Sequence, residues 1–536
     1  MRTTCLLAIV AGLLGAGSVR AGDVPGKDAT GVRYHGGDEV VLQGFHWNSV
    51  RANGGKAWYA TLAKNASRIA ADGFTTIWMP PPWTDAPKSA TQGGEGYFWN
   101  SFDKNSLYGS DADLHRAVDA MRGAGVKIVY DIVPNHIDKA RLPQSQPGSD
   151  VPVGDRWLFR DDCADRSQCD DGAPFFSGDA DLDLTKAANI DRFTAELKNL
   201  RDNYGAGGFR FDFVKGYAGR HVDTWMKDVL DDGFCVGELW QEPGAGQTWQ
   251  DPLKAWSDSA RCTVFDFSLK AIFQKGASAI PAWKDGLGGN PESSYRRIAV
   301  TFVDNHDTGA SPGANGGQHL WELSDEALRE LAYAYILTTP GTPSVYWPDM
   351  YKDDGSNGKW HDYIRALIAL RREAGVVAGS PVTFHVGNDW LVAKVGDPVR
   401  MVVSIRSPFT GAEQSGVEGF TARFTNRDRS LRIWMAGQPK SVTKRFACDV
   451  ATVPGEDVVA AGADPALGGW SVPGALKLVY DDAASPHWQA SAVLPASFTE
   501  WKCVKVKHEG GAVLQWQPGA NNVTSPDPAD IESGHF

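Results

Sequence analysis

Eight short apolar runs of β-strand character alternate with segments of helical spacing in the part of the chain before residue 376. Near-continuous apolar strands separated by helices are typical of a parallel sheet that is covered on both faces. Eight such repeats predict an α/β fold, a (β/α)8 barrel, and a doubly wound open sheet is the alternative. The runs begin at Val40, Phe74, Val126, Gly207, Gly233, Cys262, Ile298 and Pro343.

Two stretches depart from this repeat. About seventy residues separate the third run from the fourth, more than a crossover needs, so we expect a small inserted domain at about 137–206 of a barrel spanning 22–375. The helical pattern then stops, and short alternating runs predict an all-β domain over 376–437. A polar stretch at 438–444 is expected to be a linker to a second β region, a β-sandwich, over 445–536.

The first 21 residues read as a secretory signal peptide. Arg2 precedes an apolar run from Leu6 to about Gly17 that is too short to span a membrane, and small residues follow it. The expected product is a soluble, secreted protein, and nothing in the sequence indicates more than a monomer. A net charge of −12 argues against nucleic-acid binding.

Removal of this leader would also remove Cys5 and leave six cysteines in an oxidising compartment, which predicts disulfide bonds. Fifteen pairings are possible in principle. Position along the chain favours Cys163–Cys169, Cys235–Cys262 and Cys448–Cys503.

Polar side chains gather where four of the predicted strands end. A barrel of this type builds its active site at the carboxyl ends of its strands, and no strand face there lies in open water. Unpaired buried charge is costly, so we expect these side chains to meet in one polar mouth. They are Asp131, Asn135, His136, Arg210, Asp212, Glu238, His306 and Asp307.

The segments DIVPNH, GFRFDFVKG, GELW and FVDNHD resemble, in order and spacing, the four short motifs of the α-amylase family of glycoside hydrolases. The resemblance covers roughly residues 30–437. Further segments, such as GGEGYFW and NGGQH, are similar to those of the maltotetraose-forming subgroup of this family. The resemblance implies a retaining hydrolase of α-1,4 bonds in starch and malto-oligosaccharides that acts from non-reducing ends and releases maltotetraose. The alternatives are an endo-acting amylase, a cyclodextrin-forming transglycosylase, or a noncatalytic glucan-binding protein.

The resemblance also assigns catalytic roles. Asp212 matches the nucleophile, Glu238 the general acid/base, and Asp307 the carboxylate that stabilises the transition state. We expect Arg210 to lower the pKa of Asp212 through its opposite charge. The apolar surroundings of Glu238 should raise the pKa of that acid.

Substrate contacts follow from the same resemblance. Tyr97 matches a ring that stacks on the sugar at the cleavage site, and His136 and His306 match ligands of sugar hydroxyls, beside Arg210. Asp179, in the expected insertion, matches the residue that grips the terminal sugar of the chain. The alternative for Asp179 is another calcium-loop carboxylate.

A calcium site is implied as well. Asn135, Asp170 and Asp181 would supply side-chain oxygens and Gly216 a carbonyl, all of them hard ligands of the kind that Ca²⁺ prefers. Ala173 stands where relatives tend to have another Asp, so only its backbone carbonyl can serve. Similarity to the maltotetraose-forming subgroup suggests a second ion near Asp23, His35, Asp38 and Glu39.

The last region resembles the starch-binding module often joined to amylases. Trp470 and Trp516 match paired indoles that stack on glucose rings, and Lys502 and Asn521 match hydrogen-bonding ligands. The alternative is that the two tryptophans belong to the core. Because we find no tyrosine around Glu456–Val459 or Trp488, we expect the second binding face of such modules to be depleted.

Overall fold

The computed structural model of the 536-residue chain describes residues 37–85, 93–138, 180–313, 316–318, 320–426, 428–437, 441–480, 486–495, 498–508, 511–524 and 531–536. Several expected features lie outside these residues. They are the leader at 1–21, the disulfide Cys163–Cys169, and the site residues Asp23, His35, Asp170, Ala173 and Asp179.

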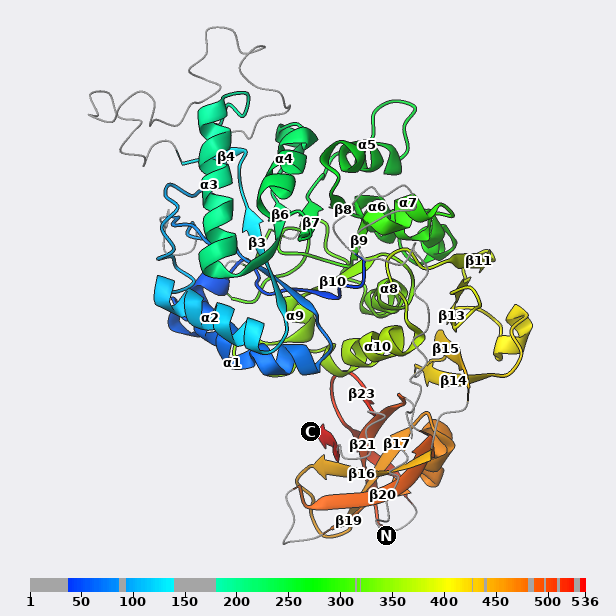
Figure 1. Ribbon diagram of the computed structural model, residues 1–536. Helices are drawn as coiled ribbons and strands as arrows, with labels where there is room; N and C mark the ends of the chain where they lie inside the picture. The colour runs from blue at the N-terminus through cyan, green and yellow to red at the C-terminus, as the bar shows by residue number, and fades with distance from the viewer. Residues whose placement is uncertain are drawn as a thin grey trace, which may run out of the picture.

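Eight parallel strands close into a barrel in the order β1-β10-β9-β8-β7-β6-β3-β2 (Figure 1). Leu42 closes the ring, because it pairs with Ile77 on one side and with Val345 on the other. The predicted (β/α)8 barrel is therefore confirmed, and each predicted run overlaps one strand of the barrel. The strands are β1 Val41–Gln43, β2 Thr76–Met79, β3 Lys127–Ile132, β6 Ala206–Phe211, β7 Phe234–Gly237, β8 Thr263–Phe265, β9 Ala299–Phe302 and β10 Thr342–Tyr346.

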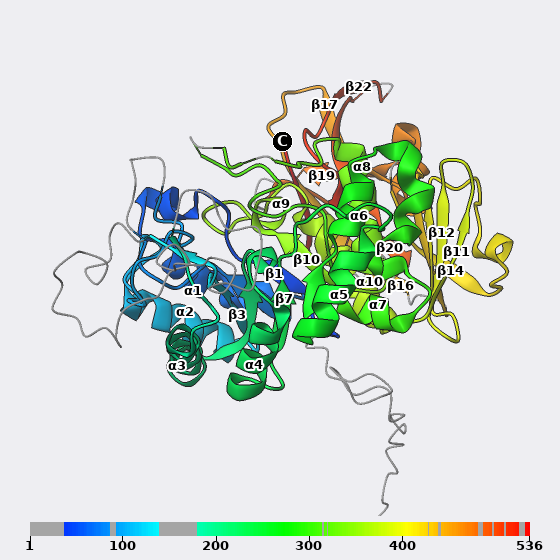
Figure 2. The same ribbon diagram turned by 90° about the horizontal axis from the view of Figure 1, so that it is seen from above.

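Helices surround the barrel, and Figure 2 shows α1 to α5 around strands β1, β3, β7 and β10. Helix α2 illustrates the local cause: Ser110 and Asp113 form a capping box at its start, and Leu114, Ala117, Val118 and Met121 form its buried face. The helices are α1 Trp58–Ala71, α2 Asp111–Gly123, α3 Ala187–Tyr204, α4 Gly219–Val229, α5 Gln250–Ala260, α6 Phe267–Phe273, α7 Ser293–Ile298, α8 Glu326–Thr338, α9 Trp347–Met350 and α10 His361–Ala374.

Helix α3 falls inside the stretch 137–206 that was expected to be an inserted domain, yet it packs in the helical ring. Its Phe193 contacts Trp225 of α4 at a ring-centroid distance of 5.6 Å and Trp83 at 6.0 Å. Only a short antiparallel pair, β4 (His136–Ile137) with β5 (Ala180–Asp181), frames the rest of that stretch among the described residues.

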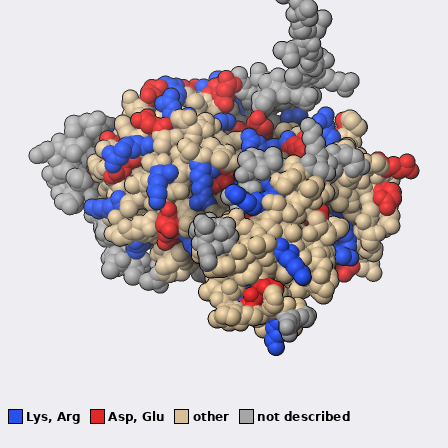
Figure 3. All heavy atoms as spheres, turned by 90° about the horizontal axis from the view of Figure 1, so that it is seen from below, with Lys and Arg blue, Asp and Glu red and all other residues tan. Residues whose placement is uncertain are grey.

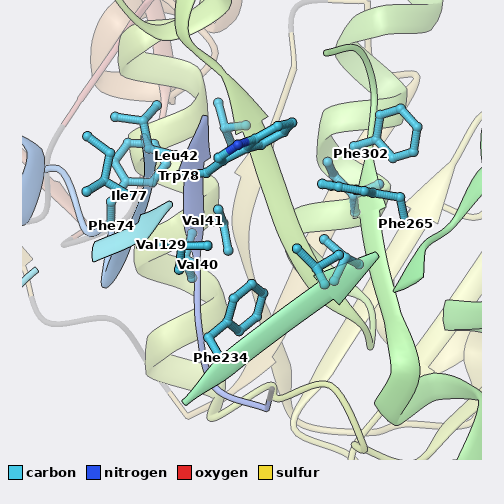
Figure 4. Close-up of a cluster of buried hydrophobic side chains, with 14 of the residues drawn as sticks. Val40, Val41, Leu42, Phe74, Ile77, Trp78, Val129, Phe234, Phe265 and Phe302 are labelled. Atoms are coloured by element: carbon cyan, nitrogen blue, oxygen red, sulfur yellow. The ribbon is translucent and has the colours of Figure 1, made fainter. Parts of the chain in front are cut away.

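Buried aliphatic and aromatic side chains pack together at the barrel strands (Figure 4). Trp78 lies 5.3 Å from Phe265 and Phe265 lies 5.5 Å from Phe302, measured between ring centroids. Each large aromatic ring buries about 150–250 Å² of surface. This packed core is the rigid floor on which the strand ends stand.

An antiparallel sheet follows the barrel, in the order β11-β12-β13-β15-β14. Strand β12 shows its alternation, because Leu391 and Ala393 join the core of the barrel while Val392 packs with Trp434 on the other face. The strands are β11 Val382–Val386, β12 Leu391–Val395, β13 Met401–Ile405, β14 Phe420–Thr425 and β15 Leu431–Ala436.

The last region is a sandwich of two sheets, β19-β20-β16-β24 and β18-β17-β21-β22, with β23 paired to β21. Its first strand starts at Ser441, so residues 441–444, expected in the linker, are already strand. The strands are β16 Ser441–Asp449, β17 Glu456–Gly462, β18 Leu476–Lys477, β19 Val479–Tyr480, β20 Trp488–Pro495, β21 Glu500–Lys507, β22 Val513–Trp516, β23 Asn522–Val523 and β24 Ile531–His535.

Two of the expected disulfides are confirmed. Cys235 of β7 is bonded to Cys262 just before β8, and Cys448 of β16 is bonded to Cys503 of β21. The second bond therefore ties the two sheets of the sandwich together.

The sandwich lies against α10 of the barrel through β23 (Figure 1). Phe498 and Val523 of the sandwich belong to the same buried hydrophobic cluster as the barrel core. No helix among the described residues is long and apolar enough to cross a membrane. On the face drawn in Figure 3, acidic and basic side chains are interspersed, so the described residues there form no continuous basic patch for nucleic acid.

Candidate active site

The ends of strands β3, β6 and β7 deliver three carboxylates to one place. Asp131 is in β3, opposite Arg210 of β6, while Asp212 and Glu238 directly follow β6 and β7. The strand ladder continues for one residue beyond β6, since the Asp212 N–H donates to the Ile132 carbonyl at 2.8 Å. The Glu238 N–H likewise donates to the Phe211 carbonyl at 3.0 Å, so backbone bonds fix both carboxyl groups.

Arg210 is the fully buried hub of this group. Its Nη1 donates to Asp131 Oδ1 at 2.8 Å and to Asp212 Oδ1 at 2.6 Å. Its Nη2 lies 3.1 Å from Glu238 Oε2, and its Cζ lies 5.0 Å from the centre of the Trp78 ring. One guanidinium thus holds three carboxylates from three strands above the aromatic floor of the barrel.

Burial raises the pKa of all four carboxyl groups near Arg210. The pKa of Asp131 rises to about 7, and that of Asp307 lies well above its ordinary value. The pKa values of Asp212 and Glu238 are raised too, because desolvation outweighs the charge of Arg210. Arg210 lowers the pKa of Asp212 as expected, but burial outweighs this effect and the net pKa is raised, while the raised pKa expected for Glu238 agrees.

Asp212 and Glu238 lie close enough to affect each other's pKa. Both carboxyl groups contact Arg210, and the negative charge of Asp212 helps to raise the pKa of Glu238. The Phe213 N–H donates to Glu238 Oε2 at 3.2 Å. Two carboxyl groups this close do not readily ionise together, so the arrangement favours one ionised and one protonated group, as acid–base chemistry needs.

Asp307 and His306 form the opposite side of the cavity. The Gln318 amide donates to Asp307 Oδ1 at 2.7 Å, and His306 Nε2 lies 3.3 Å from Asp307 Oδ2. Burial lowers the pKa of His306 well below its ordinary value, so this ring is neutral. With Gln43 Nε2 donating to His306 Nδ1 at 2.8 Å, the ring proton sits on Nε2, facing Asp307.

A stack of flat rings lines the mouth. Tyr97 lies parallel to His306 at 5.2 Å and to Trp47 at 5.6 Å between centroids, with interplanar angles of 12° and 14°. The cavity measures about 380 Å³, within the range of small-molecule sites. It is lined by Trp47, Tyr97, Phe98, His136, Asp212, Phe213, Lys215, Glu238, Trp240, His306, Asp307, Gln318 and Leu320.

All the strand-end residues predicted to bind or cut the substrate meet in or beneath this cavity. Sequence reasoning assigned no role to Trp47, Lys215, Trp240 or Gln318, although each stands within or next to a motif that it used. Their side chains reach the cavity only because the loops after the strands fold inward, which a strand pattern does not reveal.

Three of the expected calcium ligands come together beside this site. Strand β4 pairs His136 with Asp181, and the Leu182 N–H donates to the Asn135 carbonyl at 2.9 Å. A Cβ added to Gly216 would lie 2.0 Å from Asn135 Oδ1, so only glycine lets that amide approach the backbone. The Asn135 and Asp181 side chains are 1% exposed, and such buried oxygen donors fit a hard cation.

The second expected ion site is only partly described. Glu39 pairs with Lys127 at 2.7 Å and accepts the Gly37 N–H, whereas Asp38 lines a separate cavity. No group of three or more His, Cys, Asp or Glu side chains poised for a metal occurs among the described residues. The described part of the chain therefore adds no support for this second ion.

In the sandwich, Trp470 and Trp516 face each other at 6.3 Å between centroids, tilted by 44°, and both are half-buried. Lys502 is only 5% exposed, because its ammonium donates to the carbonyls of Gln517 at 2.9 Å and Gly519 at 2.6 Å. Asn521 donates to Glu500 Oε2 at 2.9 Å. Both polar residues thus shape the loop that follows Trp516.

A tyrosine does lie beside Trp488, contrary to expectation. Tyr480 is 47% exposed, and its ring centroid is 5.3 Å from that of Trp488 and 5.5 Å from that of His487. The sequence places Tyr480 eight residues before Trp488, and only the pairing of β19 with β20 brings them together. The segment VYDD, which contains Tyr480, was the part of the sequence that could have indicated this tyrosine.

Comparison with known proteins decides the family. The chain is 47% identical over 542 residues to the "Glucan 1,4-alpha-maltotetraohydrolase" of Stutzerimonas stutzeri and 46% identical to that of Roseateles saccharophilus. In both cases the match covers 96% of each chain. The chain belongs to the glucan 1,4-alpha-maltotetraohydrolase family.

Other comparisons agree with this membership. Residues 358–417 match the model of "Glucan 1,4-alpha-maltotetraohydrolase, domain C", and residues 441–530 match "Starch binding domain". The structure resembles that of an α-amylase from Geobacillus thermoleovorans, with a TM-score of 0.53 and 16% identity over 85% of this chain and 96% of that one. That last likeness bears on the fold alone.

Replacement of Arg210 by Met should destabilise the fold in a pH-dependent way. The carboxyl groups around it have raised pKa values, so their stabilising contribution exists below their ordinary pKa and is lost as pH rises from about 4 to 7. Without the guanidinium this loss of stability becomes larger. Removal of one partner from such a buried ion pair lowers the free energy of unfolding by about 3–5 kcal/mol. Denaturant unfolding at pH 4 and pH 7 measures it.

Arg371→Met is the matched control. Arg371 is equally buried but donates to carbonyl oxygens, at 2.7 Å to Thr339 and 2.5 Å to Gly341. Its removal leaves no raised carboxyl pKa behind, so its penalty should be the same at both pH values. A penalty for Arg210→Met that is equally flat with pH would contradict the electrostatic role.

Proposed function

We propose that this chain is a secreted hydrolase that acts on α-1,4-glucans from their non-reducing ends, releases maltotetraose and retains the anomeric configuration. The observation that carries the proposal is the pair of carboxyl groups of Asp212 and Glu238, both held by Arg210 beside an aromatic wall. Membership of the maltotetraohydrolase family supports the substrate and the product. The expected leader and the disulfides support export, because such bonds persist in oxidising compartments.

In the proposed mechanism, ionised Asp212 attacks the anomeric carbon while protonated Glu238 gives its proton to the leaving oxygen. The two carboxyl groups of retaining enzymes stand about 5–5.5 Å apart, and the contacts of both groups with one guanidinium, that of Arg210, support such proximity. Glu238 then takes a proton from water, which breaks the glycosyl-enzyme bond. Asp307 stabilises the developing positive charge, and the neutral His306 beside it adds no competing cation.

The product profile tests this proposal. From soluble starch at low conversion, maltotetraose should dominate from the first time points, and iodine staining should persist while reducing ends accumulate. Asp212→Asn should remove the activity, and Asp179→Ala should widen the product sizes, because Asp179 is proposed to hold the chain end. A broad size range with early loss of blue colour would indicate an endo enzyme, and cyclic products would indicate a transglycosylase.

We also propose one calcium ion beside the catalytic strands. Asn135, Asp181 and the Gly216 carbonyl would hold it, with Asp170 and the Ala173 carbonyl from the insertion. The ion would tie the insertion to the strand that leads to Asp212. Its own contribution would be structural.

Chelation should therefore lower the melting temperature. An ion that binds only the folded chain stabilises it by about 2.7 kcal/mol at a hundredfold excess over Kd. Differential scanning calorimetry with and without EDTA measures this, and added Ca²⁺ should restore the parent value. Asp181→Asn should melt lower and respond less to the chelator. An unchanged melting temperature in EDTA, with no calcium by elemental analysis, would refute the site.

The sandwich is proposed to hold the enzyme on raw starch through Trp470 and Trp516. The double replacement by Ala should weaken adsorption to starch granules at least about tenfold, which is about 1.4 kcal/mol. Turnover of maltopentaose in solution should stay the same. Trp390→Ala, at a half-buried tryptophan directly before β12, is the control and should adsorb normally. Normal adsorption of the double variant would assign both indoles to the core.

A further inference from the structure

Tyr97 makes three contacts that fix its position at the cavity. Its ring lies nearly parallel to those of Trp47 and His306, and the three ring centroids are 5.2 to 5.6 Å from one another. Its hydroxyl donates to Asp131 Oδ2 at 2.7 Å, so it also completes the group around Arg210. These contacts require the backbone of Tyr97 to be placed accurately.

The backbone around Tyr97 is neither helix nor strand. Gly93, Gly94 and Gly96 all have positive φ angles, of 81°, 90° and 94°. A Cβ on Gly96 would lie 2.6 Å from the Pro81 side chain. A turn of glycines has many alternative conformations, so something other than regular secondary structure has to select this one.

Contacts made by Asp85 select this conformation of the glycine turn. Its Oδ2 accepts the N–H of Gly96 at 3.0 Å and the N–H of Phe98 at 3.3 Å, the two residues on either side of Tyr97. The side chain is 3% exposed, so water does not compete for these bonds. A carboxylate that accepts two backbone N–H groups fixes the direction of both peptides.

The surroundings of the Asp85 carboxyl group disfavour its charged form. Burial and the charge of Glu95 raise the pKa of Asp85 to about 7, although the bonds from Gly96 and Phe98 lower it. Arg51 pairs with Glu95 at 2.8 Å. Asp85 takes no part in the proposed chemistry. The free-energy cost of burying its carboxyl group therefore has to be offset by the turn that it stabilises.

We propose that Asp85 is the positioning residue of Tyr97: by binding the two flanking N–H groups it holds the ring in the stack that receives the sugar. This inference rests on the proposed function only in that the stacked ring is taken to meet the substrate. Loss of the Asp85 carboxyl should let the glycine turn relax and displace the ring. The chemistry of Asp212 and Glu238 should remain.

A double-mutant cycle on the full chain tests the proposal. Asp85→Ala should lower kcat/KM on maltopentaose by about ten- to a hundredfold, mainly through KM, the effect of a misplaced binding group. If Asp85 acts through Tyr97, the double variant Asp85→Ala/Tyr97→Ala should lose no more than Tyr97→Ala alone. Additive losses would overturn the proposal.

Asp72→Ala is the matched control. Asp72 is a buried aspartate that binds Tyr351 at 2.6 Å and His361 at 2.9 Å, at the end of α1. Its loss should lower the melting temperature and combine additively with Tyr97→Ala.

Asp85→Asn should retain most activity, because an amide oxygen can still accept both N–H groups. A loss in Asp85→Asn as large as in Asp85→Ala would overturn the proposal, and Asp85→Asn decides it alone if the alanine variant does not fold.

Near-ultraviolet circular dichroism gives a readout independent of turnover. The rings of Trp47 and Tyr97 should change their signal in Asp85→Ala and keep it in Asp85→Asn, whose amide oxygen can still accept both N–H groups. An inactive parent enzyme would refute the proposed function and leave this comparison intact. An active parent with an unchanged aromatic spectrum in Asp85→Ala would refute the positioning role alone.

Discussion

The guanidinium of Arg210 is the interaction on which the catalytic end of this barrel depends. It is the shared cation of three buried carboxylates, from β3 and from the ends of β6 and β7. One positive charge cannot balance them all in a medium of low polarity, so part of the group stays protonated. Because of that imbalance, the carboxyl groups of Asp212 and Glu238 can differ in protonation state.

The barrel makes this arrangement possible in a way that local sequence cannot. Parallel strands bring residues that are far apart in the chain to one rim, and the register between β3 and β6 sets Asp131 beside Arg210. Trp78 supports Arg210 from below and also donates to Asp131 Oδ2 at 3.1 Å. The aromatic core is thus the support of the charged group as well as the main source of burial.

The eight strands and the residues at their ends could be predicted, because apolar runs and helical spacing are local and a barrel has one place for polar strand ends. The net pKa shift of Asp212 could not, since desolvation depends on how completely the closed rim excludes water. Tyr480 was missed because a strand pair, and no spacing in the chain, brings it to Trp488. The carbonyl partners of Lys502 could not be predicted either, because they come from a loop that the pattern leaves unspecified.

The sandwich is joined to the barrel more firmly than a tethered module would be. Phe498 and Val523 lie in the hydrophobic cluster of the barrel, so separation of the two parts would expose apolar surface on both. The loop that follows Trp516 meets residues of α10 around the cavity lined by Trp360, Tyr363, Lys502 and Asn521. A starch chain bound at the paired indoles would therefore stand in a fixed direction relative to the catalytic cavity. Adsorption and hydrolysis are then linked by geometry, beyond the local concentration that a flexible linker provides.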